Sequence, residues 1–194
     1  MRTIVWLAVA LFFLAGATVF VTARGDEGAP AVKKEAEKKE YGFIGAQSCK
    51  TCHNIPAKGE QFAKWQSSKH AKAYQTLLND QSKAIATGKK LTKPAHEAPE
   101  CLRCHVTAWD AKAELKGAKF DPAEGIGCES CHGPGAEYKA VHMKDVPKAM
   151  TLGMIAPGEA LCVSCHNPES PTFKEFKYAE ALAVVAHPNP KKAK

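Results

Sequence analysis

Residues 128–132 read Cys128-Glu129-Ser130-Cys131-His132, and the Cys-x-x-Cys-His pattern that they form occurs four times in the chain. The other copies are Cys49-Lys50-Thr51-Cys52-His53, Cys101-Leu102-Arg103-Cys104-His105 and Cys162-Val163-Ser164-Cys165-His166. All eight cysteines of the 194 residues fall in these motifs. The pattern is typical of covalent c-type haem attachment, so we expect four haem c groups, each with its iron.

Helical geometry explains why this spacing suits a haem. In one helical turn, cysteines at positions i and i+3 and a histidine at i+4 share one face. The two thiols can form thioethers with the two vinyl groups of the haem, while the histidine reaches the iron from the same side. We therefore expect all eight cysteines to bind the cofactor and the four motif histidines to bind iron: Cys49, Cys52, Cys101, Cys104, Cys128, Cys131, Cys162 and Cys165, with His53, His105, His132 and His166.

Two other uses of paired cysteines explain the sequence less well. Zinc sites use Cys-x-x-Cys pairs, but zinc does not require a histidine directly after every pair. Disulfides suit an exported domain, yet they leave the same four histidines unexplained.

The chain has four further histidines, which is the number of sixth ligands that four irons need: His70, His96, His142 and His187. His70, His142 and His187 lie on apolar faces of expected helices. An unpaired imidazole is costly there, so we predict that these three bind iron. His96 lies between two prolines without a helical pattern, and its role as a ligand stays open.

Methionine is the competing sixth ligand, and it would raise the reduction potential of a haem. The candidates are Met143, Met150 and Met154. Because the histidines suffice in number, we interpret these methionines as packing residues.

The chain begins with an uncharged apolar run of 20 residues, 4–23. Its length suits a membrane-spanning helix, whereas the small residues near Ala17 and Ala23 suit a cleaved signal peptide. We expect residues 1–23 to be a membrane anchor or a signal peptide, residues 24–40 a flexible charged tether, and residues 41–190 the tetrahaem cytochrome c domain. Both alternatives predict a periplasmic or other extracytoplasmic domain, and an uncleaved run would hold it at the inner membrane.

The formal net charge of +7 would by itself suggest nucleic acid or anionic lipid as a partner. Four haems, however, add eight propionates and, when oxidised, four positive iron centres, which lowers the sum to about +3. We therefore expect no nucleic-acid partner. The lysines form either a solvated surface or a docking face for an acidic redox protein.

Residues 41–190 contain few side chains for an ordinary core. Leu, Ile, Val and Phe number 24 there, a fraction that by itself hints at disorder. Haems would supply the missing apolar core. We predict a mainly α, haem-cored fold with long loops and little or no sheet. The expected helices cover residues 59–79, 136–146, 162–166 and 172–186. The structure of the segment 81–99 is less clear because glycine and prolines interrupt it.

The residues around the motifs resemble the tetrahaem cytochrome c-554 family, multihaem cytochromes related to hydroxylamine oxidoreductases. The similarity runs over residues 41–187 and is carried by four segments, 45–53, 65–71, 101–107 and 125–135. The most specific are the Lys-His-Ala element, residues 69–71, and the glycine-framed third motif, residues 125–135.

This resemblance implies haems in touching pairs, with axial ligands that come from distant segments. The implied ligand pairs are His142 with His53, His70 with His132, and His187 with His166. The family often leaves the second haem five-coordinate. Here that is the haem of His105, with His96 as the one obvious candidate to complete it.

Electron transfer between redox partner proteins is the function that these features favour. One alternative is a reductase of nitrogen oxides or peroxide at an open second haem. The only candidate acid–base groups are His96, Glu97 and Glu100, so we favour a carrier over an enzyme and assign no catalytic residue. The other alternative is a subunit of a haem filament, and the oligomeric state stays open.

Overall fold

A computed structural model describes residues 39–187 and residue 190 of the chain. These residues lie within one compact unit, Lys38–Lys194. The predicted anchor or signal segment, 1–23, and the predicted tether up to residue 38 lie outside the described residues. No helix in the described part of the chain is long and apolar enough to cross a membrane.

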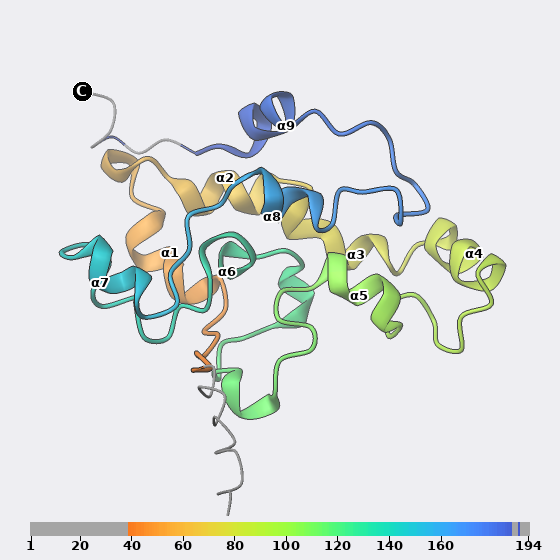
Figure 1. Ribbon diagram of the computed structural model, residues 1–194, viewed down its shortest axis with the longest axis horizontal. Helices are drawn as coiled ribbons and strands as arrows, with labels where there is room; N and C mark the ends of the chain where they lie inside the picture. Colours follow the sequence, from red (N-terminus) through yellow and green to blue (C-terminus); the bar gives the residue numbers. More distant parts are fainter. Residues whose placement is uncertain (1–38, 188–189, 191–194) are drawn as a thin grey trace, which may run out of the picture. The chain divides into compact units, whose positions relative to one another are not determined.

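The fold consists of short helices joined by long connections (Figure 1). The helices are α1 Gln47–His53, α2 Gln61–Ser67, α3 Ala73–Thr76, α4 Asp80–Gly88, α5 Pro99–His105, α6 Cys128–His132, α7 Val146–Met150, α8 Glu159–Val163 and α9 Tyr178–Val185. The 3-10 turns are η1 Pro56–Lys58, η2 His70–Lys72, η3 Ala113–Leu115 and η4 Pro122–Glu124. Over residues 39–187 there is no strand, only an isolated bridge between Phe43 and Lys116. The predicted mainly α class is confirmed.

All four Cys-x-x-Cys-His motifs adopt the helical turn that haem attachment requires. Three lie wholly within helices, namely α1, α5 and α6. The fourth begins in α8, and the turn continues beyond it because the backbone N–H of His166 donates to the carbonyl of Cys162 at 2.9 Å. Each motif therefore presents its two cysteines and its histidine on one face.

The prediction of one continuous helix over 59–79 is wrong, because this segment forms three separate elements, α2, η2 and α3. The break falls at Ser68, whose backbone is extended with φ −75° and ψ 165°. Its hydroxyl accepts a hydrogen bond from the N–H of Ala71 at 3.3 Å, a local bond that competes with helix. His70 consequently begins a 3-10 turn instead of continuing a long helix.

Two other predicted helices are shorter or displaced. Residues 136–144 form hydrogen-bonded turns, and α7 starts only at Val146 because Asp145 is extended and its carboxylate accepts from the N–H of Lys148. The helix expected over 172–186 is shorter in the structure, where only α9 is helical and begins after the extended residue Lys177. The less clear segment contains α4, which Asn79 caps by accepting from the N–H of Ser82 at 2.8 Å.

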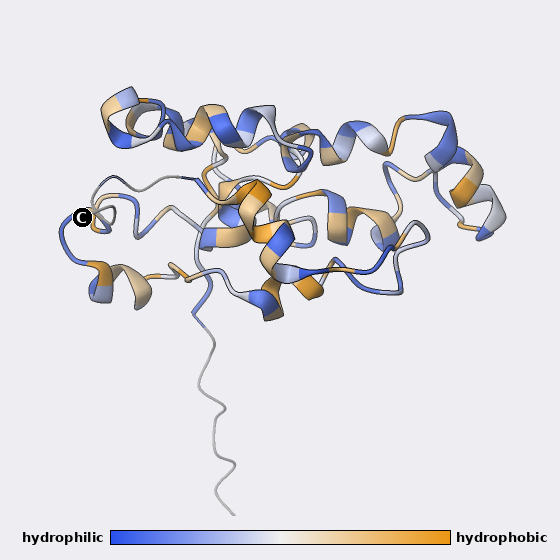
Figure 2. Cartoon of the chain, turned by 90° about the horizontal axis from the view of Figure 1, so that it is seen from above, coloured by the Kyte–Doolittle hydropathy of each residue, from blue (hydrophilic) through white to orange (hydrophobic). Residues whose placement is uncertain are grey.

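The buried core is small and consists mainly of alanine. Six of the ten buried apolar residues in the described chain are alanines, and Phe62 is its one fully buried large side chain. Among the same described residues, eleven large apolar side chains are exposed. Figure 2 shows apolar and polar residues mixed along the helices, without a continuous apolar layer. Native cores are densely packed with large side chains, so this fold fits one that wraps apolar groups other than its own residues.

Candidate haem sites

The structure brings six of the eight histidines together in three pairs. The pairs, with the distances between ring centroids, are His53 and His142 at 6.0 Å, His70 and His166 at 6.0 Å, and His132 and His187 at 5.9 Å. Each pair joins a motif histidine to one of the three histidines that lie on predicted apolar faces. Sequence reasoning thus selected all six residues.

The separations fit an iron between the two rings of each pair. An imidazole nitrogen binds a metal at about 2 Å and lies about 1.2 Å from the centre of its ring, so rings on opposite sides of one iron have centroids about 6.4 Å apart. The three observed distances are within about 0.5 Å of that value. The residues present therefore fit a six-coordinate haem iron at three sites.

The pairs differ in the angle between their ring planes. This angle is 19° for His53 and His142, so these rings are nearly parallel. It is 65° and 62° for the pairs that contain His166 and His132, so those rings are closer to perpendicular.

Two of the three pairings implied by the resemblance are wrong. His142 faces His53 as expected, but the ring of His70 faces His166 and the ring of His187 faces His132. The backbone of His70 does approach the third motif, because its carbonyl accepts from the N–H of Ile126 at 3.0 Å. The side chain is directed to the fourth motif instead.

A glycine next to the third motif permits the close approach of the His70 backbone. Gly125 has a φ of +69°, and a Cβ atom there would lie 2.7 Å from the carbonyl oxygen of His70. Such a φ is rarely accessible to other residues, so this position requires glycine. Gly125 thereby helps to place His70.

Partial burial favours the form that binds metal in three of the paired histidines. Desolvation lowers the pKa of His53, His70 and His132 below the ordinary value, because a buried imidazolium is costly. Only the neutral imidazole has a free nitrogen for a metal.

Oxygen atoms of the chain hold the Nδ1 atoms of several candidate ligands. Nδ1 of His142 lies 2.8 Å from the carbonyl of Lys139, and Nδ1 of His187 lies 3.2 Å from that of Val185. Nδ1 of His53 lies 3.3 Å from Oε1 of Gln61. Such bonds fix the ring and leave Nε2 for the metal. No pattern in the sequence indicates these partners.

The second motif lacks a histidine pair. Nδ1 of His105 lies 2.8 Å from the carbonyl of Ala73 and 3.2 Å from the hydroxyl of Thr76. Among the described residues, no second histidine ring faces His105. His96 lies in a turn with its side chain about a third exposed, and its Nε2 is 3.5 Å from Oε1 of Glu97.

The cysteines show which motifs are neighbours. The thiols of Cys49 and Cys128 interact, which lowers the pKa of Cys49 and raises that of Cys128. Burial, followed by the nearby thiol of Cys165, raises the pKa of Cys104 to about 11. The first motif therefore adjoins the third, and the second adjoins the fourth.

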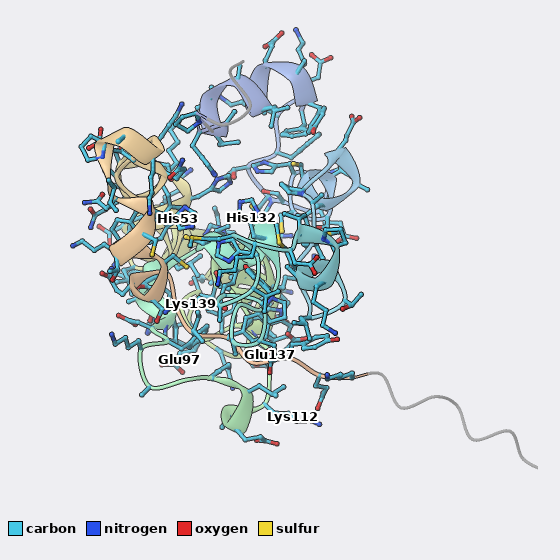
Figure 3. The ribbon with its side chains drawn as sticks, turned by 90° about the vertical axis from the view of Figure 1, so that its left-hand side faces the viewer. His53, Glu97, Lys112, His132, Glu137 and Lys139 are labelled. Atoms are coloured by element: carbon cyan, nitrogen blue, oxygen red, sulfur yellow. The ribbon has the colours of Figure 1, made fainter. Side chains whose placement is uncertain are left out.

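The third and fourth motifs are also neighbours. Burial raises the pKa of Cys131, and the thiols of Cys162 and Cys165 add to this effect. Figure 3 shows His53 and His132 at the same level of the molecule with sulfur atoms near both. The neighbour relations thus run first, third, fourth and second motif.

A helical fold that pairs histidines beside Cys-x-x-Cys-His motifs defines a multihaem c-type cytochrome. Family comparisons agree: the profile "Cytochrome c554 and c-prime" matches residues 48–133, and the profile "Doubled CXXCH motif" matches residues 121–171. The resemblance to the cytochrome c-554 family is therefore confirmed. The wider relation to hydroxylamine oxidoreductases stays a prediction.

Individual relatives support the same family. Cytochrome c-554 of Nitrosomonas europaea is 29% identical over 151 residues, which is 70% of this chain and 62% of that protein. The C-type polyheme cytochrome OmcC of Geobacter sulfurreducens is 33% identical over 94 residues, 41% of this chain and 12% of that protein. The match thus spans less than two thirds of either relative.

A solved structure of reduced cytochrome c554 from Nitrosomonas europaea shares the fold. It superposes with a TM-score of 0.52 at 24% identity and covers 74% of this chain and 83% of that one.

Proposed function

We propose that the chain transfers electrons between redox proteins outside the cytoplasm through four covalently bound c-type haems. The observation that carries this proposal is the set of three histidine pairs, each about 6 Å across and each beginning at a Cys-x-x-Cys-His motif. In this proposal the eight cysteines form thioethers, the three pairs are axial ligands, and His105 binds the iron of the second haem.

Haem c, when bound, supplies an iron that gains and loses one electron without other bond changes. The task of the polypeptide is then to hold the four sites close together and to set their potentials. Paired histidines favour low potentials, and partial burial of His70 and His132 reduces the contact of these rings with water. The adjacency of the motifs supports an electron path that runs first, third, fourth and second site.

Binding of a small molecule at the second site is the alternative that a specific observation favours. His105 has no histidine ring opposite it among the described residues, which would leave a coordination position open. A nitrogen oxide or peroxide is the kind of ligand that such an iron binds. Ligation by His96 would close this position.

The same proposal implies a cellular location and a kind of redox partner for the domain. Covalent haem attachment occurs outside the cytoplasm, so residues 1–23 would act as an export signal or as an inner-membrane anchor. A redox partner with an acidic surface would suit the lysine-rich exterior.

Intact-mass analysis of the exported protein tests the proposal. We expect the polypeptide to carry the mass of four haems, with no cysteine open to thiol alkylation after unfolding. A potentiometric titration followed at the haem absorption bands should then resolve reversible one-electron steps. Free thiols at any motif, or a compact fold without haem, would contradict it.

A further inference from the structure

A buried carboxylate lies inside the third motif. Glu129 is between the two cysteines of that motif and is 4% exposed, the one buried charged residue in the described chain. Its oxygens accept from the backbone N–H groups of Ile44 at 3.0 and 3.1 Å, Gly45 at 2.8 Å and Gly135 at 2.7 Å.

These partners indicate that Glu129 is ionised. All three are N–H donors, and both carboxylate oxygens accept, so a protonated acid would find no acceptor for its own O–H among them. Burial raises the pKa of Glu129, while the three backbone donors oppose that change because they favour the charged form.

Glu129 lies in the third motif, and its charge also reaches the first motif. The interaction with Cys128 lowers the pKa of Cys49, and the negative charge of Glu129 acts in the opposite direction by raising it. Its hydrogen bonds to residues 44 and 45 also tie the chain just before α1 to α6. Glu129 is therefore part of the third motif and directly contacts the segment that leads into the first.

We propose that Glu129 is a positioning residue whose fixed negative charge lowers the reduction potentials of the first and third haems. A ferric haem carries one more positive charge than a ferrous haem, so a nearby buried anion favours the oxidised state. The inference rests on the proposed function, since it concerns the potentials of those haems.

The chain offers a matched control for this charge. Glu137 also accepts from the backbone of the same segment, because its carboxylate lies 3.2 and 3.4 Å from the N–H of Gly42. Unlike Glu129, Glu137 is exposed, so water screens its charge. If Glu129 only held the backbone in place, loss of its charge and loss of the charge of Glu137 would have the same effect on the haem reduction potentials.

Glu129→Gln and Glu137→Gln, each prepared as the haem-loaded protein, separate the two roles by potentiometric titration at fixed pH. We expect two of the four potentials to rise in Glu129→Gln and none to move in Glu137→Gln. Unchanged potentials in both variants would overturn the inference, as would equal rises in both.

Glu129→Asp keeps the test decisive if Glu129→Gln does not assemble. This variant retains the charge but shortens the side chain, so it should keep potentials near those of the native protein. A rise in Glu129→Asp would show that shape and not charge matters, and would overturn the inference. Haem content is measured on every sample: native protein without haem defeats the proposed function, whereas loaded Glu129→Gln with native potentials defeats this inference alone.

Discussion

His53 and His142 face each other with ring centroids 6.0 Å apart and ring planes only 19° apart. His53 ends α1, whereas His142 lies in the turns before α7. In the proposed function these two residues bind one iron from opposite sides, so the pair ties the start of the domain to its second half.

Replacement of His142 by alanine should convert one haem from low spin to high spin. The thioethers to Cys49 and Cys52 and the bond from His53 remain, so we expect the haem content to stay the same. Electron paramagnetic resonance of the oxidised protein should show one low-spin signal lost and a high-spin signal gained.

His96→Ala is the matched control for this variant. His96 contacts Glu97 and faces no second histidine ring in the described chain, so its loss should leave the low-spin signals unchanged. An unchanged spectrum in His142→Ala would show that His53 and His142 do not share an iron.

The angles between ring planes predict two kinds of low-spin signal in the native protein. Parallel imidazole planes separate the iron d orbitals more than perpendicular planes do. The His53 and His142 pair should therefore give a rhombic spectrum, while the pairs that contain His166 and His132, at 65° and 62°, should give strongly anisotropic low-field features.

His142→Ala assigns these signals. It should remove the rhombic component and leave the two anisotropic ones in place. Loss of an anisotropic component instead would mean that the ring orientation of this pair differs in the haem-loaded protein.

The sequence selected the histidines that form pairs in the structure because the chemistry of an iron ligand restricts the residue type. A histidine on an apolar helix face needs a partner, and this selected His70, His142 and His187. The helical fold followed in the same way from the scarcity of large apolar residues.

The histidine that each of these three residues faces could not be predicted from the sequence. His70 faces His166 because of how η2 and the fourth motif pack, and no local pattern encodes such a contact. The contacts of Glu129 could not be predicted for the same reason, since its donors Ile44 and Gly45 lie far away in the sequence.

Carbon monoxide should bind to one haem of the reduced native protein. His105 is the motif histidine that no second histidine ring faces within residues 39–187, so its iron has an open position in our proposal. We expect an absorption change of the size expected for one haem in four, and none at the three sites with paired histidines.

Comparison with His96→Ala decides the role of His96. If carbon monoxide binds the native protein and the variant equally, His96 is not a ligand. If it binds only the variant, His96 closes the second site, and both the open position and the proposed small-molecule chemistry are excluded.

Replacement of Gly133 by alanine should destabilise the protein strongly. Gly133 follows α6 with a φ of +81°, and a Cβ atom there would lie 2.1 Å from the carbonyl oxygen of Gly153. The backbone strain alone costs about 1–3 kcal/mol, and the clash with backbone adds to it. We expect the free energy of unfolding to fall by more than about 2 kcal/mol, measured by guanidinium titration of the haem-loaded protein.

Gly88→Ala is the opposite case at the end of α4. A Cβ atom there meets nothing within 4 Å, and the residue is helical, so alanine should raise the free energy of unfolding by about 0.5–1 kcal/mol. The contrast separates strain at Gly133 from a general effect of losing glycine. Equal changes in the two variants would mean that the turn after the third motif relaxes to accept a side chain, and that Gly133 does not fix the position of His132.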